Sequence, residues 1–352
     1  MAWLPLHNEL EKALAEEWLS YLDEGGLLGG TAYRETFGAF SNASSGALFY
    51  SALARLCTGA FRVFTLSQMD AWRERGLLFA DDLLKMPRET ASNLSIADLS
   101  AVQRAFQSAW TVSGEPVWRS AALRQADALR DRLRGMAPQP TEGNLEPRAN
   151  LLGAACQLAK TASACGDEDL LSWLRQVVQD HLPDAEALFS RAGLSDGMPD
   201  EATVRRIYHT SRMLRTLIEL DGCIPELDIA ARLPELYKIF REQTDHPPHA
   251  AAQRQCRKNV SFAAAWITAW LEATVCHAAM IERFPAAARP AWMGLRDLWW
   301  YWRDPDTWWL IPPAARHKRP LPPDVALTVS QLYEGLPVYL QGMRHCTQPL
   351  FE

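Results

Sequence analysis

Residues with metal-binding chemistry gather in one short part of the sequence. His246 and His249 flank two prolines, which favour an extended polyproline conformation with three residues per turn. We therefore expect both imidazoles to point to one side of the chain, as ligands for a divalent metal or haem iron. Cys256 and His277 follow and are further candidates. The alternative interpretation is a loop whose histidines cap helix ends or face water.

A carboxylate interrupts the most apolar segment of the chain, residues 260–281. Glu272 lies in this segment with Trp266 and Trp270. If the segment is a buried helix, this carboxylate must be paired or neutralised. Ionisable groups in such surroundings are candidates for acid–base chemistry, so Glu272 and His277 are the predicted catalytic residues. The alternative is an ion pair between Glu272 and an arginine.

The stretch 296–309, RDLWWYWRDPDTWW, holds five of the 14 tryptophans. On a helix, Trp292, Arg296 and Trp299 or Trp300 fall on adjacent turns, so guanidinium groups are expected to stack on indoles. The indoles have three candidate roles: fixing helices to the core, lining a pocket for an aromatic or cationic ligand, or forming a contact surface. The predicted substrate contacts are Trp266, Trp270, Trp299, Trp302 and Arg303.

Two weaker signals have simpler interpretations. The adjacent aspartates Asp81 and Asp82 are of the type that binds Mg²⁺, but Lys85 follows and no second metal motif exists, so a solvated helix face is preferred. In the helix expected at 201–220, the residues on a different face from the apolar ones are ionisable. A solvated charged stripe explains them, and an anion-binding face is the alternative. They are Arg205, His209, Arg212 and Glu219.

The elements that must position these groups are helices. Apolar residues recur with a helical period, alternation with period two is almost absent, and Leu and Ala dominate over Val and Ile. We therefore expect an all-α fold of about a dozen helices. No repeat of constant length persists, which favours an irregular multi-helix bundle or a helical barrel-like array over a solenoid.

The clearest linker in the sequence is the proline-rich stretch 137–147. It predicts an N-terminal helical subdomain, residues 1–136, and a C-terminal one, residues 148–352. The second contains a long central helix expected at 250–284 and the tryptophan-rich segment.

Smaller signals set expected helix ends. Ser67 and Ser95 are expected N-caps. Thr58-Gly59 is expected to interrupt a helix, and residues 167–181 and 184–192 are expected to form separate helices.

Charge and cysteine usage limit the class of protein. The net charge is −6, with 42 acidic and 36 basic residues, which disfavours nucleic-acid binding. The seven cysteines have no regular spacing and indicate reduced thiols in the cytoplasm. No signal peptide is expected. The segment 260–281 approaches membrane-spanning length, but its Ala content and its Glu and His favour a buried helix over a membrane span.

No phosphate loop, dinucleotide fingerprint, nucleophile elbow, zincin helix or paired CxxC occurs in the sequence. The leading hypothesis is a cytosolic enzyme with an aromatic- and His-lined helical pocket in the C-terminal part, acting on a small aromatic or cationic molecule, with haem or a divalent metal as candidate cofactor. The alternative is a non-catalytic interaction protein, such as an adaptor, an inhibitor or an immunity-type binding protein. Its partner protein would bind the tryptophan-rich segment.

Overall fold

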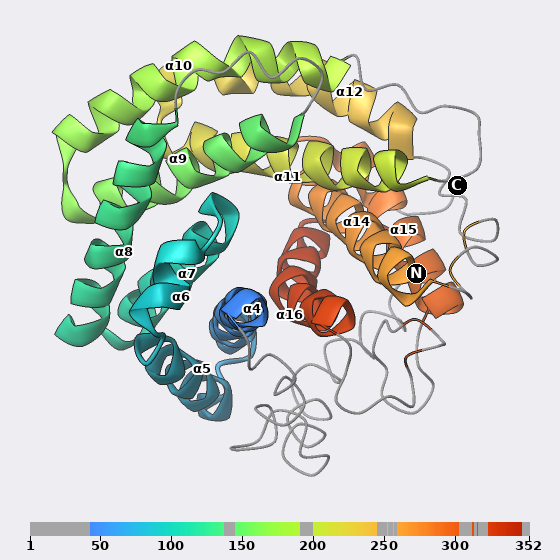
Figure 1. The fold of residues 1–352 in the computed structure, drawn as a ribbon. Helices are drawn as coiled ribbons and strands as arrows, with labels where there is room; N and C mark the ends of the chain where they lie inside the picture. The colour runs from blue at the N-terminus through green and yellow to red at the C-terminus, as the bar shows by residue number, and fades with distance from the viewer. Residues whose placement is uncertain are drawn as a thin grey trace. The chain divides into compact units, whose positions relative to one another are not determined.

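The described part of the chain is almost entirely helical. In this computed structural model it forms twelve α-helices, with short 3-10 turns and no strands, which confirms the all-α prediction (Figure 1). The chain divides into two compact units, unit 1 with residues 1–93 and 248–352, and unit 2 with residues 94–247. The structure describes residues 43–136, 145–190, 200–244, 259–302 and 323–346, and the single positions 252, 256, 312 and 315.

This division differs from the one that the sequence predicts. The expected linker, residues 137–147, falls inside unit 2, between α8 (Pro116–Gly135) and α9 (Leu145–Cys165), and these two helices pack against each other. Unit 1 is instead built from two stretches that are far apart in the sequence. A proline-rich stretch reveals a local break in helical structure but not which helices pack together.

Unit 1 is a row of packed helices. Each helix packs against the next in the order α5, α4, α16, α14, α15, and the short α6 packs against α4. The bounds are α4 (Ala43–Ser67), α5 (Asp70–Leu84), α6 (Arg88–Asn93), α14 (Val260–Ala279), α15 (Ala288–Trp302) and α16 (Pro323–Arg344).

Glycines allow α16 to approach both of its neighbours closely. A Cβ on Gly59 would lie 2.5 Å from the carbonyl oxygen of Tyr333, and one on Gly342 would collide with the carbonyl of Ala278. The expected interruption at Thr58-Gly59 is therefore wrong: α4 is continuous, and this glycine marks a helix crossing.

Unit 2 is built around α9, which packs against α7, α8, α10 and α11 and is buried on nearly all sides. Figure 1 shows α7, α9 and α11 as one layer of this unit, with α8, α10 and α12 forming a second. The remaining bounds are α7 (Ile96–Ser113), α10 (Glu168–Ser190), α11 (Glu201–Cys223) and α12 (Leu233–Thr244).

Local signals predict some helix ends and not others. Ser95 caps α7 by accepting a hydrogen bond from the backbone N–H of Asp98 at 3.2 Å, as expected. Ser67 does not cap α5, which starts after Met69. The expected break near Pro183 is also wrong, because α10 continues through it. Packing outweighs the lost hydrogen bond there, since one stripe of α10 is fully buried. This stripe is Leu174, Val178, Leu182, Ala185 and Phe189.

The long central helix is shorter than expected. α14 begins at Val260, capped by Asn259, whose side chain accepts a hydrogen bond from the N–H of Phe262 at 3.0 Å, and it ends at Ala279. In the part of the chain that the structure describes, no helix combines the length and the apolar character needed to cross a membrane.

Candidate functional site

The two predicted catalytic residues lie on different sides of α14. Glu272 and His277 are five residues apart, which corresponds to about 140° around a helix axis. His277 is buried on the same face as Trp270, whereas Glu272 is half-buried on another face. The structure therefore does not bring this carboxylate and this imidazole together.

Four of the predicted substrate contacts fall at a similar level of α14 and α15, but Trp299, five residues from Gly294, lies about 140° around α15 from the side that contacts α14. A Cβ on Gly294 of α15 would lie 2.5 Å from Oγ1 of Thr274 on α14. These two residues therefore lie side by side where α14 and α15 contact each other. Because the connection is short, we infer that the helices run antiparallel, and Trp266 and Trp270 are then level with the C-terminal end of α15. We call Trp266, Trp270, Trp299 and Trp302 the tryptophan cluster.

The tryptophan cluster contains buried donors that lack acceptors. The rings of Trp266 and Trp270 are 5.7 Å apart, and both side chains are buried. Trp299 and Trp302, one turn apart on α15, are 6% and 1% exposed, and neither indole N–H has an acceptor among the described residues. Buried indole N–H groups usually have a hydrogen-bond partner, but those of Trp72 on α5 and Trp118 on α8 also lack an acceptor among the described residues, so this feature is not restricted to the cluster.

The other aromatic residues of α15 face outward or stack on arginine. The guanidinium of Arg296 lies 5.2 Å from the ring centre of Trp292, which confirms the expected stacking for this pair. Arg296 also donates to Oδ1 of Asp297 at 2.6 Å. Trp300 is 84% exposed. Of the indoles on α15, Trp300 alone faces solvent, whereas Trp292, Trp299 and Trp302 are buried.

The predicted metal ligands His246 and His249 lie outside the described residues, as does Arg303. Within the described ranges, no group of three or more His, Cys, Asp or Glu side chains is arranged to hold a metal ion. Cys256 is buried, and burial raises the pKa of its thiol to about 12, which favours the protonated form over the metal-binding thiolate.

The aspartate pair on α5 fits the interpretation of a solvated helix face at Asp81, whereas the side chain of Asp82 is only 16% exposed. Asp81 is exposed, and Asp82 forms an ion pair with Lys85 at 2.8 Å.

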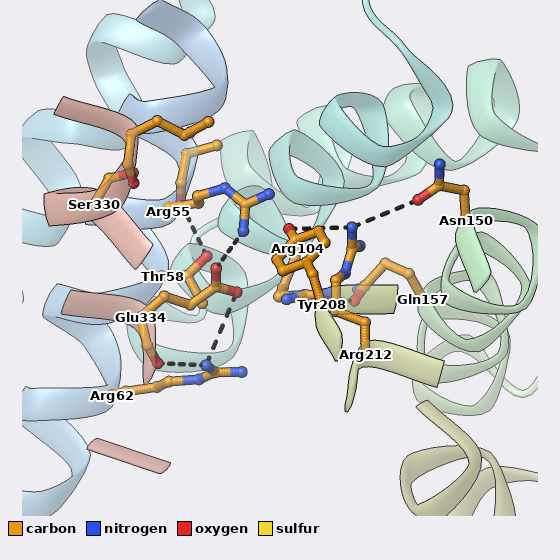
Figure 2. Close-up of polar contacts among 12 residues, drawn as sticks. Arg55, Thr58, Arg62, Arg104, Asn150, Gln157, Tyr208, Arg212, Ser330 and Glu334 are labelled. Atoms are coloured by element: carbon orange, nitrogen blue, oxygen red, sulfur yellow. Dashed lines mark hydrogen bonds and ion pairs between the residues drawn. The ribbon is translucent and has the colours of Figure 1, made fainter. Parts of the chain in front are cut away.

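Unit 1 also contains an ion-pair cluster that sequence reasoning missed. Glu334 of α16 is 4% exposed, and its carboxylate lies 2.9 Å from Nη1 of Arg55 on α4 (Figure 2). Nη1 of Arg62, two turns further along α4, donates to the backbone carbonyl of Glu334 at 2.8 Å and lies 3.9 Å from its carboxylate. In the sequence, Glu334 is a single acidic residue in an apolar stretch, which could have indicated a buried ion pair. Its partners on α4 lie too far away in the sequence to be predicted.

Unit 2 carries a polar layer where α7, α9 and α11 meet. The amide of Gln157 on α9 donates to Gln107 of α7 at 2.5 Å and accepts from Nε of Arg104 at 3.2 Å. Gln103 donates to the hydroxyl of Thr161 at 2.5 Å. The sequence did not predict this network, because glutamines in an amphipathic helix look like ordinary surface residues.

The ionisable set predicted on α11 contributes to the same layer. Oε2 of Glu219 lies 2.6 Å from Nζ of Lys160 on α9. Burial alone would raise the pKa of Glu219, but Lys160, then Arg104 and Arg215, hold it well below its usual value. His209 is buried, and burial, then the nearby Arg212 and Arg205, lowers its pKa to about 4. Arg205 itself is exposed and pairs with Glu201 at 3.7 Å.

Comparisons of this chain with protein-family models, with curated proteins and with solved structures find no match. The chemistry of the side chains is therefore the only guide to function.

Proposed function

We propose that this chain binds a small aromatic or cationic molecule at the tryptophan cluster of unit 1 and acts on it as an enzyme. The observation that carries the proposal is the pair of buried indole N–H groups on Trp299 and Trp302 that have no acceptor among the described residues. A planar ligand with a hydrogen-bond acceptor would satisfy both donors and stack on the neighbouring indoles.

The catalytic group of this proposal must come from a residue near the cluster. On α14, Glu272 lies two residues from Trp270, whereas His277 lies seven residues from it, roughly 10 Å at the helical rise, so Glu272 is the nearer of the two candidate catalytic groups. Arg303 directly follows Trp302 in the chain and is the candidate contact for a polar substituent. His246 and His249 remain the proposed ligands of a divalent metal or haem iron, which would supply Lewis-acid or redox chemistry.

We also propose a cytoplasmic location, in a reducing environment. All seven cysteines are free thiols, and four of them are buried. Buried thiols of this kind behave as small apolar side chains.

Three ligands of matched shape test the binding proposal. Quinoline has an aromatic nitrogen acceptor, naphthalene has none, and N-methylquinolinium is a cation without an acceptor. We expect quinoline to bind the full chain more tightly than naphthalene, measured by ligand-observed NMR. Trp302→Phe keeps an aromatic ring but removes the donor and should abolish this advantage, while Trp300→Phe, at the exposed indole, should preserve it. Equal affinities for quinoline and naphthalene in the wild type would count against the proposal.

The cofactor part has a separate test. The absorption spectrum and the metal content of the purified full chain are measured directly. A chain with neither a Soret band nor bound metal would remove the cofactor-dependent version and leave the binding proposal intact.

A second candidate function rests on Trp300. An indole that is 84% exposed is typical of a contact point with a partner protein, and the chain would then be a non-catalytic interaction module. Capture of partners by the wild type and by Trp300→Ala distinguishes the two functions. Loss of a partner in the variant, with quinoline binding unchanged, would favour the interaction module.

A further inference from the structure

An arginine in the polar layer of unit 2 has no acidic partner among the described residues. Nη1 of Arg212 donates to Oδ1 of Asn150 at 3.5 Å and to the hydroxyl of Tyr208 at 3.4 Å, and both distances are long for hydrogen bonds (Figure 2). The guanidinium also lies 5.4 Å from the ring centre of Tyr208. These neutral neighbours position the cation of Arg212 without neutralising it.

A second arginine lies against the same face of α9. Nε of Arg104 donates to Oε1 of Gln157, and a Cβ on Gly153 would lie 3.9 Å from Nη2 of Arg212. Gly153 and Gln157 are one helical turn apart, so the two guanidinium groups contact positions separated by roughly 6 Å. Figure 2 shows the side chains of Arg104 and Arg212 on either side of Tyr208.

The carboxylate that α11 contributes to this layer, that of Glu219, is already bound by Lys160 at 2.6 Å, so it is not the partner of Arg212. Lys160, Arg104 and Arg215 each lower the pKa of Glu219. Arg212 is a further cation on these packed helices, and it has no acidic partner among the described residues. A cation in this position favours a bound anion.

A further polar atom in this region has no partner. Nδ1 of His209, one turn before Arg212 on α11, is buried and has no hydrogen-bond partner in the described part of the chain. The side chain of His209 is 10% exposed. Its Nε2 lies 3.6 Å from the carboxylate of Glu146, so Nδ1 is the nitrogen left without a contact. Because Nε2 faces a carboxylate and the pKa of the imidazole is lowered to about 4, Nδ1 of the neutral ring is an acceptor, so it calls for a donor such as water rather than for an anion.

We propose that Arg104 and Arg212 bind one small oxyanion, the phosphate or carboxylate group of a metabolite, beside Gly153 on α9. Guanidinium groups bind such anions through paired, charge-assisted hydrogen bonds. The missing side chain at Gly153 leaves room next to Arg212, and the second N–H of the Gln157 amide, whose first donates to Gln107, can add a neutral donor. The site belongs to unit 2 and shares no residue with the tryptophan cluster.

Titration of the full chain with inorganic phosphate, and separately with succinate, tests this site. The ionic strength is held constant with chloride, and binding is measured by calorimetry. We expect saturable binding of at least one anion. The anion that binds more tightly identifies the group as a phosphate or a carboxylate.

Matched variants locate the binding. Arg212→Gln should weaken it about ten-fold or more, because it removes a charge-assisted contact. Arg205→Gln removes the same charge from the same helix at an exposed position and should leave the affinity within about two-fold. If Arg212→Gln does not fold, Arg212→Lys keeps the charge but loses the paired geometry and should also weaken binding.

Two results would overturn the proposal. One is the absence of saturable binding of either anion to the wild type. The other is an equal loss of affinity in the Arg205 and Arg212 variants, which would show that only the overall charge matters.

Discussion

Nζ of Lys160 lies 2.6 Å from Oε2 of Glu219, and this ion pair joins the central helix of unit 2 to α11. Sγ of Cys156 donates to the same oxygen at 3.7 Å. The pair anchors a layer whose other hydrogen bonds are mostly between neutral amides and hydroxyls. It therefore makes both the stability and the charge of this layer depend on pH.

We expect Glu219→Gln to destabilise the chain at pH 7 and to lose this effect in acid. The folded pKa of Glu219 lies below the 4.5 of an ordinary glutamate, so the stabilisation is present above pH 4.5 and disappears as the pH falls below it. Since 30% of the side chain is exposed, solvent screening limits the effect to on the order of 1 kcal/mol. Urea unfolding at pH 7, 5, 4 and 3 measures it.

Glu201→Gln is the matched control for this prediction. Glu201 pairs with Arg205 on the same helix, but both side chains are 72% exposed. This variant should unfold like the wild type at every pH. A constant difference between Glu219→Gln and the wild type from pH 7 to pH 3 would contradict the prediction.

Because of His209, we expect the free energy of unfolding to fall as the pH is lowered from 6.5 to 4. The unfolded imidazole binds a proton near pH 6.5, whereas the buried one does so at about 4, so acidification in this range favours the unfolded state. The shift corresponds to a loss of up to about 3 kcal/mol. The carboxylate of Glu146 opposes it weakly, because that side chain is 46% exposed.

Replacement of His209 by Asn removes the titrating group and should flatten the pH dependence of the unfolding free energy. The midpoint of urea unfolding at pH 7, 5.5 and 4.5 checks this. If the variant and the wild type lose stability in parallel, His209 is not the group responsible.

Gly59→Ala should destabilise unit 1 strongly. The new Cβ would lie 2.5 Å from a backbone carbonyl oxygen of α16, and neither helix can move without disturbing its other neighbours. The expected cost is about 1–3 kcal/mol, as for other overpacked cores. Gly46→Ala, in the same helix, meets nothing closer than 3.5 Å and should be neutral or stabilising by up to about 1 kcal/mol. Thermal unfolding of both variants is compared, and similar melting temperatures would refute the close approach.

Glu334→Gln should cost about 3–5 kcal/mol, because it leaves the guanidinium of Arg55 without its buried partner. The double variant Arg55→Met/Glu334→Leu should recover part of this loss, since an apolar pair leaves no uncompensated charge. Glu201→Gln, which breaks a pair whose two side chains are 72% exposed, is the control and should change the free energy of unfolding by less than about 1 kcal/mol. A double variant no more stable than Glu334→Gln would contradict the ion-pair interpretation.

The sequence predicts the fold class because helical periodicity is a local property. It also predicts the cap at Ser95 and the stacking of Arg296 on Trp292, which depend on neighbours within one turn. The continuity of α10 through Pro183 could not be predicted, because it depends on burial against other helices.

The candidate sites were predictable to different degrees. Composition identifies the tryptophan cluster and the ionisable face of α11. The residues that contact these groups come from other parts of the chain and could not be predicted. Gly153 and Gln157, for example, face their partners on α11 and α7 only after α9 has packed against these helices. Glu334 was missed for the same reason, because all residues of unit 2 lie between it and its partners on α4 in the sequence.

The pairing of α4 with α16 has a consequence for synthesis. Helix α4 leaves the ribosome early, yet α16, which covers its apolar face, is the last helix in the described part of the chain. Unit 2, by contrast, is continuous in sequence and is complete before α14 emerges. For most of translation, α4 therefore exposes side chains that belong in a core, as a long-range partner of this kind requires.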